Sequence, residues 1–208
     1  MDGAWVDRLE RRLGFLAVPG LPGMLTAMTG AAALLAASKP EFVYALALDP
    51  EALRGGQVWR AVTFLIVPPQ SSLLWMLLWL AMIFAVLSAL EAAWGEFKLT
   101  VFLAIGCVMS TLAALATGGI GDNGPVHLAS FLAFARLAPD REVLVMFVLP
   151  VKLRWIAAVA AALTAIQLLG GDYASRARLL AGLSAYLIYF GEGHWQDLKL
   201  AWRRRGQR

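Results

Sequence analysis

The stretch SSLLWMLLWLAMIFAVLSALEAAW, residues 71–94, carries a single charged side chain, that of Glu91. A helix needs about 20 mostly apolar residues to cross the ~30 Å hydrocarbon core of a bilayer, so this stretch predicts a transmembrane helix. The rest of the chain is similar: of its 208 residues 60% are hydrophobic and 15% are charged, against about 25% charged in a typical soluble domain. We expect a polytopic membrane protein with one compact domain.

Five further apolar runs surround this stretch, so we expect an all-α fold with six transmembrane helices. The expected spans lie near residues 21–38, 71–94, 99–117, 125–138, 151–169 and 178–189. The fourth is shorter than the roughly 17–25 residues of an ordinary span, and we expect it at the centre of the bundle. The connection at 39–70 is too polar for a transmembrane helix and too apolar for a fully solvent-exposed loop. The piece EVLVMFVLP, residues 142–150, is expected at the membrane interface.

The basic residues predict the orientation, because Lys and Arg are concentrated on the cytoplasmic side of membrane proteins. With the N-terminus inside, thirteen of the 18 Lys and Arg residues lie on the cytoplasmic side and five on the other. Both termini are therefore expected in the cytoplasm, and we expect the bacterial inner (plasma) membrane. The expected divisions are an amphipathic or cytoplasmic segment at 1–20, a membrane domain at 21–191 and a basic cytoplasmic tail at 192–208.

The N-terminal segment has two interpretations that the sequence leaves open. One is an amphipathic surface helix with its apolar residues on one face and arginines on the others; those apolar residues are Trp5, Leu9, Leu13 and Leu16. The other is a frayed terminus. The stretch MDGAWVDRLERRLG mixes acidic and basic residues and has no clean cleavage site, so we expect no removable signal peptide.

Metal and thiol chemistry find little support in the sequence. Cys107 is the only cysteine, and the two histidines, His127 and His194, lie far apart along the chain. The chain has a net charge of +4. In a membrane protein, such an excess of basic residues more often reflects the orientation in the membrane than nucleic-acid binding. We expect no cofactor, no metal site and no nucleic-acid partner. The expected partners are membrane lipids and other integral membrane proteins.

Three polar positions in or beside the apolar runs are candidate sites. Trp59 and Arg60 lie at an expected membrane interface, where Trp is enriched and Arg can extend to the headgroups, so we expect contact with lipid or a client protein. Glu91 lies near the end of its span, where a charge is usually paired or functional. We favour a structural contact between Glu91 and backbone amides of the next turn at the cytoplasmic edge.

His127 and Ser130 lie three residues apart in GPVHLAS, which places both on one face of a helix. A serine becomes a nucleophile only when a base lies within hydrogen-bond reach, and a third group usually orients that base. The sequence offers no evident third group. We therefore interpret both as structural polar residues, with Ser130 bonding to its own helix. A catalytic pair is the less favoured alternative, and we assign no catalytic residue.

Several segments between about Gly55 and Tyr189 have an order and spacing that resemble the rhomboid family of six-helix intramembrane serine proteases. The matching segments are Gln57 with Trp59 and Arg60, TFLIVPP (63–69), Glu91 with Gly95, FARLAPDREVLVMFVLPVKLRWIA (134–157) and LLAGLSAYL (179–187). The resemblance implies a rhomboid-like helix bundle.

The catalytic positions of that family are not matched. Its serine lies in a G-x-S-G motif that the chain lacks, and the corresponding place falls near Gly124. Its sixth-helix histidine is replaced within DYASRARLLAG (172–182), and its oxyanion residues fall near Ser72 and Met76. The resemblance therefore implies an inactive member, a pseudoprotease.

The resemblance implies that such a protein is not an enzyme and binds transmembrane segments of other membrane proteins. One alternative is a structural or accessory subunit of a larger membrane complex, to which the eight tryptophans could contribute an interface. Another is a divergent intramembrane serine protease that uses His127 and Ser130. A transporter is less favoured, because ionisable residues inside the spans are few and no internal repeat is evident.

Overall fold

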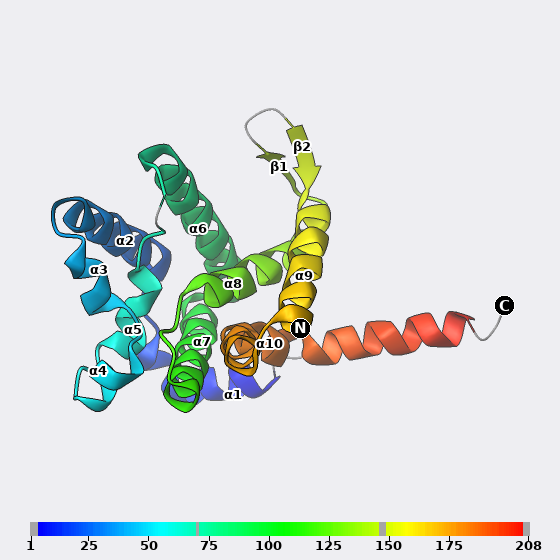
Figure 1. Ribbon diagram of the computed structural model, residues 1–208. Coiled ribbons are helices and arrows are strands. Elements are labelled where there is room, and N and C mark those ends of the chain that lie inside the picture. Colours follow the sequence, from blue (N-terminus) through cyan, green and yellow to red (C-terminus); the bar gives the residue numbers. More distant parts are fainter. Residues whose placement is uncertain (1–3, 70, 146–148, 206–208) are drawn as a thin grey trace.

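The structure, a computed structural model, describes residues 4–69, 71–145 and 149–205 and is mostly helical (Figure 1). The long helices are α1 (Ala4–Leu13), α2 (Leu21–Ser38), α6 (Leu73–Trp94), α7 (Glu96–Thr117), α8 (Gly124–Leu137), α9 (Leu153–Gly170) and α10 (Tyr173–Arg205). Short helical turns fill the connections: η1 (Gly14–Leu16), α3 (Glu41–Leu46), α4 (Pro50–Arg54), α5 (Arg60–Thr63) and η2 (Phe64–Ile66).

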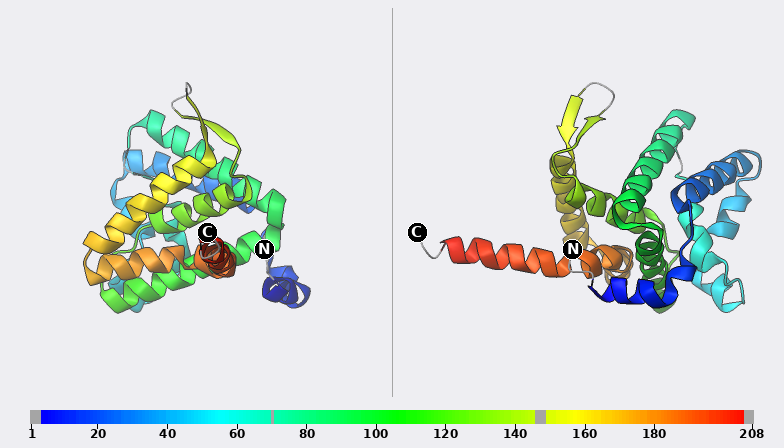
Figure 2. Two further views of the ribbon diagram at one scale, coloured as in Figure 1. Left: turned by 90° about the vertical axis from the view of Figure 1, so that its right-hand side faces the viewer. Right: turned by 180° about the vertical axis from the view of Figure 1, so that it is seen from behind.

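Four helices of the described residues, α2, α6, α7 and α9, are long and apolar enough to cross a membrane. Their bounds agree with four of the expected spans to within a few residues. The other two expected spans correspond to α8, which has 14 residues, and to part of α10, which has 33. Six transmembrane helices remain a prediction, as do the divisions of the chain at residues 20 and 191. Helix α10 continues past residue 191 without a break, and its C-terminal half projects away from the bundle (Figures 1 and 2).

A small β-hairpin was not predicted. Strands β1 (Glu142–Val145) and β2 (Leu149–Lys152) pair antiparallel, with Glu142 opposite Lys152. A short apolar run between turn residues is consistent with either a strand or a helix, and periodicity alone does not distinguish them. Residues 146–148 of the expected interfacial piece lie outside the described residues. The all-α expectation therefore holds for most of the chain but missed this hairpin.

Helix α8 lies at the centre of the bundle, as its length and small residues predicted. Ala129, Ser130 and Ala133 have no exposed surface. Two glycines allow the close approach of the neighbouring helices, Gly106 on α7 and Gly182 on α10. A Cβ atom at Gly106 would lie 3.0 Å from Val126 of α8, and one at Gly182 would lie 3.2 Å from the backbone nitrogen of the same residue. Small residues thus let α8 pack tightly against α10 and let its first turn meet α7 at Val126.

The connection between α2 and α6 folds into a compact layer against the bundle. Phe64, Leu65 and Ile66 of η2 are buried in the core. The N–H of Gly121 donates to the carbonyl of Leu48 at 2.8 Å, which ties this layer to the loop before α8. The connection is therefore part of the fold and helps to position the start of α8.

Residues 4–13 form helix α1, which is docked on the bundle, while its place on a membrane surface remains a prediction. It crosses the end of α7 (Figures 1 and 2). Val6 is buried, and the ring of Trp5 packs edge-on against Tyr189 of α10 with 5.8 Å between centroids. The ammonium of Lys98 lies 2.6 Å from the carboxylate of Asp7. Leu9 and Leu13 remain partly exposed, as expected of an amphipathic surface helix.

The docking of α1 is expected to weaken in acid. A hydrogen bond from Lys98 holds the pKa of Asp7 below its usual range. The contact between Asp7 and Lys98 therefore stabilises the docked helix fully above the pKa of Asp7 in the unfolded chain, about 3.9. This stabilisation is lost as the pH falls through the lower pKa of Asp7 in the docked helix. At neutral pH, Asp7→Asn should speed hydrogen exchange in residues 4–13 relative to the wild type. Below the pKa of Asp7 the two proteins should exchange alike, and a difference that persisted there would contradict the assignment.

Candidate functional site

The loop before α8 holds the start of this helix against the layer formed by the connection. The carboxylate of Asp122 accepts a hydrogen bond from the N–H of Gly124 at 2.8 Å. The side-chain amide of Asn123 donates to the carbonyls of Leu65 and Val67 at 3.1 and 2.9 Å. The Asp122 bond is the local kind that Asp favours in turns, whereas the Asn123 bonds reach the distant connection, so both the loop sequence and this tertiary contact position the N-terminus of α8.

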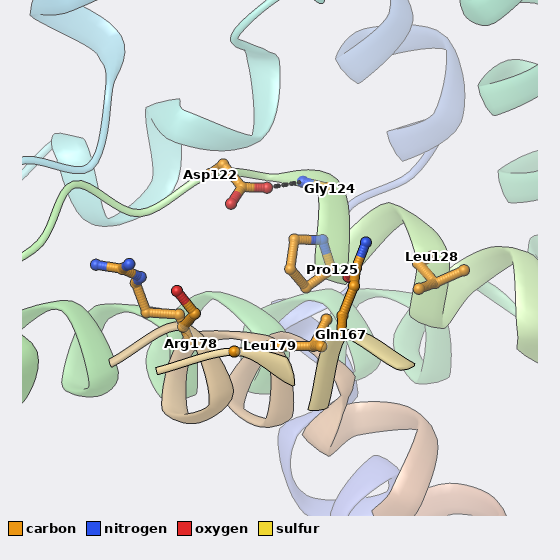
Figure 3. Close-up of a pocket in the computed structure, with 9 residues that line it drawn as sticks. Asp122, Gly124, Pro125, Leu128, Gln167, Arg178 and Leu179 are labelled. Atoms are coloured by element: carbon orange, nitrogen blue, oxygen red, sulfur yellow. Dashed lines mark hydrogen bonds between the residues drawn. The ribbon is translucent and has the colours of Figure 1, made fainter. Parts of the chain in front are cut away.

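A polar cavity of about 680 Å³ lies where the start of α8, the end of α9 and the start of α10 meet (Figure 3). Its walls include Asp122 from the loop, Gln167 from α9, and Ser175 and Arg178 from α10. Figure 3 shows that Asp122, Gln167 and Arg178 come from three separate elements and surround Pro125. A carboxylate, an amide, a hydroxyl and a guanidinium thus face one space and could hydrogen-bond a polar guest group.

The start of α10 is capped beside this cavity. Asp172 accepts a hydrogen bond from the N–H of Ser175 at 3.2 Å. A side-chain hydrogen bond with Ser175 lowers the pKa of Asp172. The carboxylate of Asp172 therefore caps the start of α10 and holds the backbone of Ser175 beside the cavity.

A second cavity of about 430 Å³ adjoins the polar one and is lined from α6, α8 and α9. The two share Asp122, Gly124 and Leu128 in their walls. Helices α6 and α9 diverge on either side of α8 (Figure 1), and the second cavity lies between them. Its apolar walls are formed by Trp79, Met82, Ile83, Phe131 and Ile156, and its polar end by Asp122, Asn123 and His127.

His127 lies at that polar end and contacts the fold on two sides. Its Nε2 is 3.2 Å from the carbonyl oxygen of Leu65, and its ring packs edge-on against Trp79 with 5.1 Å between centroids. Since a carbonyl only accepts, Nε2 carries the proton in this bond. The buried Nδ1 has no hydrogen-bond partner among the described residues.

Ser130 does not complete a catalytic pair in this geometry. Its hydroxyl donates to the carbonyl of Val126, four residues earlier, at 3.1 Å, and the residue is fully buried. His127 is bound to Leu65 instead. Each side chain therefore makes a backbone contact within the fold. The side chain of His194 lies outside the part of the chain that is described.

Arg60 is engaged inside the protein rather than at the interface where it was expected. The residue is 8% exposed, and its guanidinium donates to the side chain of Gln57 at 2.7 Å and to the carbonyls of Tyr44 and Ala47 at 2.5 and 2.8 Å. Trp59, by contrast, is 53% exposed. Arg60 thus holds the connection together, while lipid or client contact at Trp59 remains a prediction.

Glu91 is half-buried near the end of α6, away from both cavities. The described residues provide no hydrogen bond to its buried Oε1, and the expected bonds to amides of the next turn are not among those that the structure shows. The N–H of Gly95 donates instead to the backbone carbonyl of Glu91 at 2.7 Å. The structure therefore gives the Glu91 side chain no part in the candidate site.

Sequence reasoning singled out His127 but missed the grouping of Asp122, Gln167, Ser175 and Arg178. A signal for it exists in the short connection between the fifth and sixth expected spans. Short connections bring consecutive helix ends together, so polar residues flanking GGD (170–172) would meet at one end of the bundle. Among the described residues, no group of three or more His, Cys, Asp or Glu side chains could hold a metal ion.

Comparison with protein families gives a match over most of the chain. No curated protein and no solved structure matches the chain. Residues 20–191 match the family described as eukaryotic integral membrane protein (DUF1751). This description overturns the expected placement in a bacterial inner membrane, while membrane localisation, and with it contact with membrane lipids, is confirmed. Because the match covers most of the chain, the protein belongs to this family of integral membrane proteins.

Proposed function

We propose that the protein is a rhomboid-like membrane protein without catalytic activity that binds transmembrane segments of other membrane proteins. The observation that carries this proposal is the cavity between the diverging helices α6 and α9. Its walls are apolar where they derive from Met82, Ile83 and Ile156, and its inner end is polar. A helix that entered from the bilayer would bury apolar side chains first and present a polar residue to the inner end.

The packing of α9 supports this proposal. Only Leu153 and Thr164 of this helix are buried. Val159 and Ile166 are each at least 60% exposed. An element with few buried contacts opens at low free-energy cost, so α9 can shift to admit a client helix beside α6.

The polar cavity suggests which clients are preferred. A polar side chain inside a membrane is costly unless it finds a hydrogen-bond partner. Gln167 and Arg178 lie in the polar cavity that continues from the second one, with Leu128 in both walls. A client segment with a polar or acidic residue near the matching depth would gain partners there, whereas a wholly apolar segment would not.

Photo-cross-linking in the membrane tests the binding site. Benzoylphenylalanine placed at Met82 or Ile156 is expected to capture integral membrane proteins. The matched control is Leu34 of α2, which is 72% exposed and lies outside both cavities. Leu128→Trp, which fills both cavities, should abolish capture at Ile156. Equal capture at Leu34, or capture unaffected by Leu128→Trp, would contradict the proposal.

The stoichiometry of the captured partners and a separate labelling experiment address the two alternatives. Exposed tryptophans such as Trp75 and Trp155 could serve a permanent interface, and one dominant partner at fixed stoichiometry would favour a structural subunit. We expect no labelling by a serine-reactive fluorophosphonate. Labelling that Ser130→Ala or Ser175→Ala removed would instead support a divergent protease.

A further inference from the structure

We propose that α1 and the adjoining turn η1 bind anionic phospholipids at one surface of the membrane, through arginines that contact the phosphate groups and exposed apolar side chains that contact the acyl chains. A hollow of about 810 Å³ lies beside α1. It is lined by the apolar side chains of Trp5, Leu9 and Leu13 and by Arg8, Arg11 and Arg12. The hollow shares no wall residue with the two cavities at α8, so it is separate from the site proposed for client segments.

Two connections hold α1 at the level where membrane spans begin. Helices α2 and α7 are candidate spans that begin at Leu21 and Glu96. Only residues 17–20 separate the end of η1 from the start of α2. The ammonium of Lys98, in the first turn of α7, lies 2.6 Å from the carboxylate of Asp7. The segment is therefore tied to the starts of two spans, which places it at one membrane surface.

The direction of α1 fits a helix that lies on this surface. In the left-hand view of Figure 2, α1 is seen nearly end-on, while α6, α7 and α9 run across the picture. Helix α1 thus lies across the direction of the spans, as an amphipathic helix in the plane of a membrane surface does. With the expected orientation this is the cytoplasmic surface, whose leaflet carries anionic lipids.

Exposed apolar side chains of this segment suit the acyl chains of a lipid. Phe15 is 80% exposed and Leu16 is 53% exposed, and Leu9 and Leu13 are each partly exposed. Leaving this apolar surface in water is unfavourable, whereas contact with acyl chains removes it from water. An interfacial helix buries its apolar face at the boundary between headgroups and acyl chains. Phe15 and Leu16 lie just before a span, so they are expected at this boundary.

The charges beside the hollow favour an anionic headgroup. Arg11 and Arg12 are exposed, and the structure shows no ion pair for either within the described part of the chain. Neither acidic residue of α1, Asp7 or Glu10, lines the hollow, and Asp7 has Lys98 as its partner. Arginine can bind phosphate oxygens through two parallel hydrogen bonds. Each basic residue near an anionic membrane surface also strengthens binding about fivefold. The site should therefore prefer anionic lipids to zwitterionic ones.

The test uses the full chain in vesicles of phosphatidylcholine, with Cys107→Ala and a fluorophore on the new cysteine of Leu16→Cys. Phosphatidylserine and phosphatidylcholine that carry a quenching spin label at the same acyl position are compared. The serine lipid should quench half-maximally at a membrane content at least about fivefold lower, because it accumulates beside the arginines. At about 1 M salt, where the Debye length falls to about 3 Å, this difference should shrink.

Charge variants test the role of the two arginines. In Arg11→Gln/Arg12→Gln the two lipids should quench alike. Arg11→Lys/Arg12→Lys keeps the charges and should keep most of the difference. Both arginines are exposed, so neither pair of substitutions should disturb the fold. A preference for the serine lipid that survived Arg11→Gln/Arg12→Gln would contradict the assignment.

Trp155 provides a control position in the leaflet where α1 is expected. It is 63% exposed near the start of α9, which is also a candidate span. The neighbouring guanidinium of Arg154 has the carboxylate of Asp140 as its partner at 3.2 Å. A fluorophore on Trp155→Cys should therefore show little preference between the two lipids.

Two further results would overturn the proposal. One is a preference at residue 16 no larger than that at residue 155, which would mean that anionic lipid is not enriched beside α1. The other is quenching of residue 16 by neither lipid, which would point to a protein partner for this surface. Client capture between α6 and α9 does not depend on these arginines, so the two proposals can fail separately.

Discussion

Replacing Arg60 with alanine is expected to destabilise the protein by about 3–5 kcal/mol. The guanidinium of this buried residue makes three hydrogen bonds, to Gln57, Tyr44 and Ala47. Alanine would remove a charged donor and leave the carbonyl oxygens of Tyr44 and Ala47 without that partner. The bonds join the end of α3 to the start of α5, so their loss should loosen the whole connection between α2 and α6.

The unfolding temperature of the purified protein measures this effect. Cys107 is the only cysteine and is buried, so a thiol-reactive dye reports unfolding during heating. Trp59→Ala is the control variant at the neighbouring position. Trp59 is 53% exposed, so this substitution should lower the unfolding temperature much less. The unfolding temperature of Arg60→Lys should lie between those of Arg60→Ala and the wild type, because an ammonium lacks the planar fork that reaches several acceptors. Similar unfolding temperatures for Arg60→Ala and Trp59→Ala would refute the structural role of Arg60.

Replacing Gly182 with alanine is expected to cost about 2–3 kcal/mol, at the upper end of the usual range for overpacking. A Cβ atom there would lie 3.1 Å from the carbonyl carbon of Pro125 and 3.2 Å from the backbone nitrogen of Val126. These are backbone atoms, so no rotamer change can relieve the contact. The helices α8 and α10 would have to separate, which would also enlarge the polar cavity that Pro125 helps to line.

Gly191 provides a control on the same helix. A Cβ atom at Gly191 would meet nothing within 4 Å. Gly191→Ala should therefore be neutral or stabilising by up to about 1 kcal/mol, because alanine has the higher helix propensity. Both variants are compared by the dye assay on Cys107. If Gly182→Ala unfolded at or above the temperature of Gly191→Ala, the tight packing of α8 against α10 would be disproved.

Helix content and membrane character could be predicted from local properties of the chain. The apolar run at 71–94 predicted α6 at Leu73–Trp94 because length and hydropathy alone decide whether a helix can span a bilayer. Small residues predicted the central position of α8 for a similar reason, since only small side chains allow neighbouring helix backbones to approach. The β-hairpin was missed because a short valine-rich run is compatible with either regular structure.

The candidate site depended on contacts between distant parts of the chain. The sequence by itself determined that this is a mostly helical membrane protein with a short central helix, because hydropathy and residue size act locally. Only the tertiary structure decided that Arg60 turns inward, that His127 bonds to Leu65, and that Gln167 and Arg178 share a cavity. A polar side chain takes whichever partner the fold brings within hydrogen-bond distance, and that partner can lie anywhere along the chain.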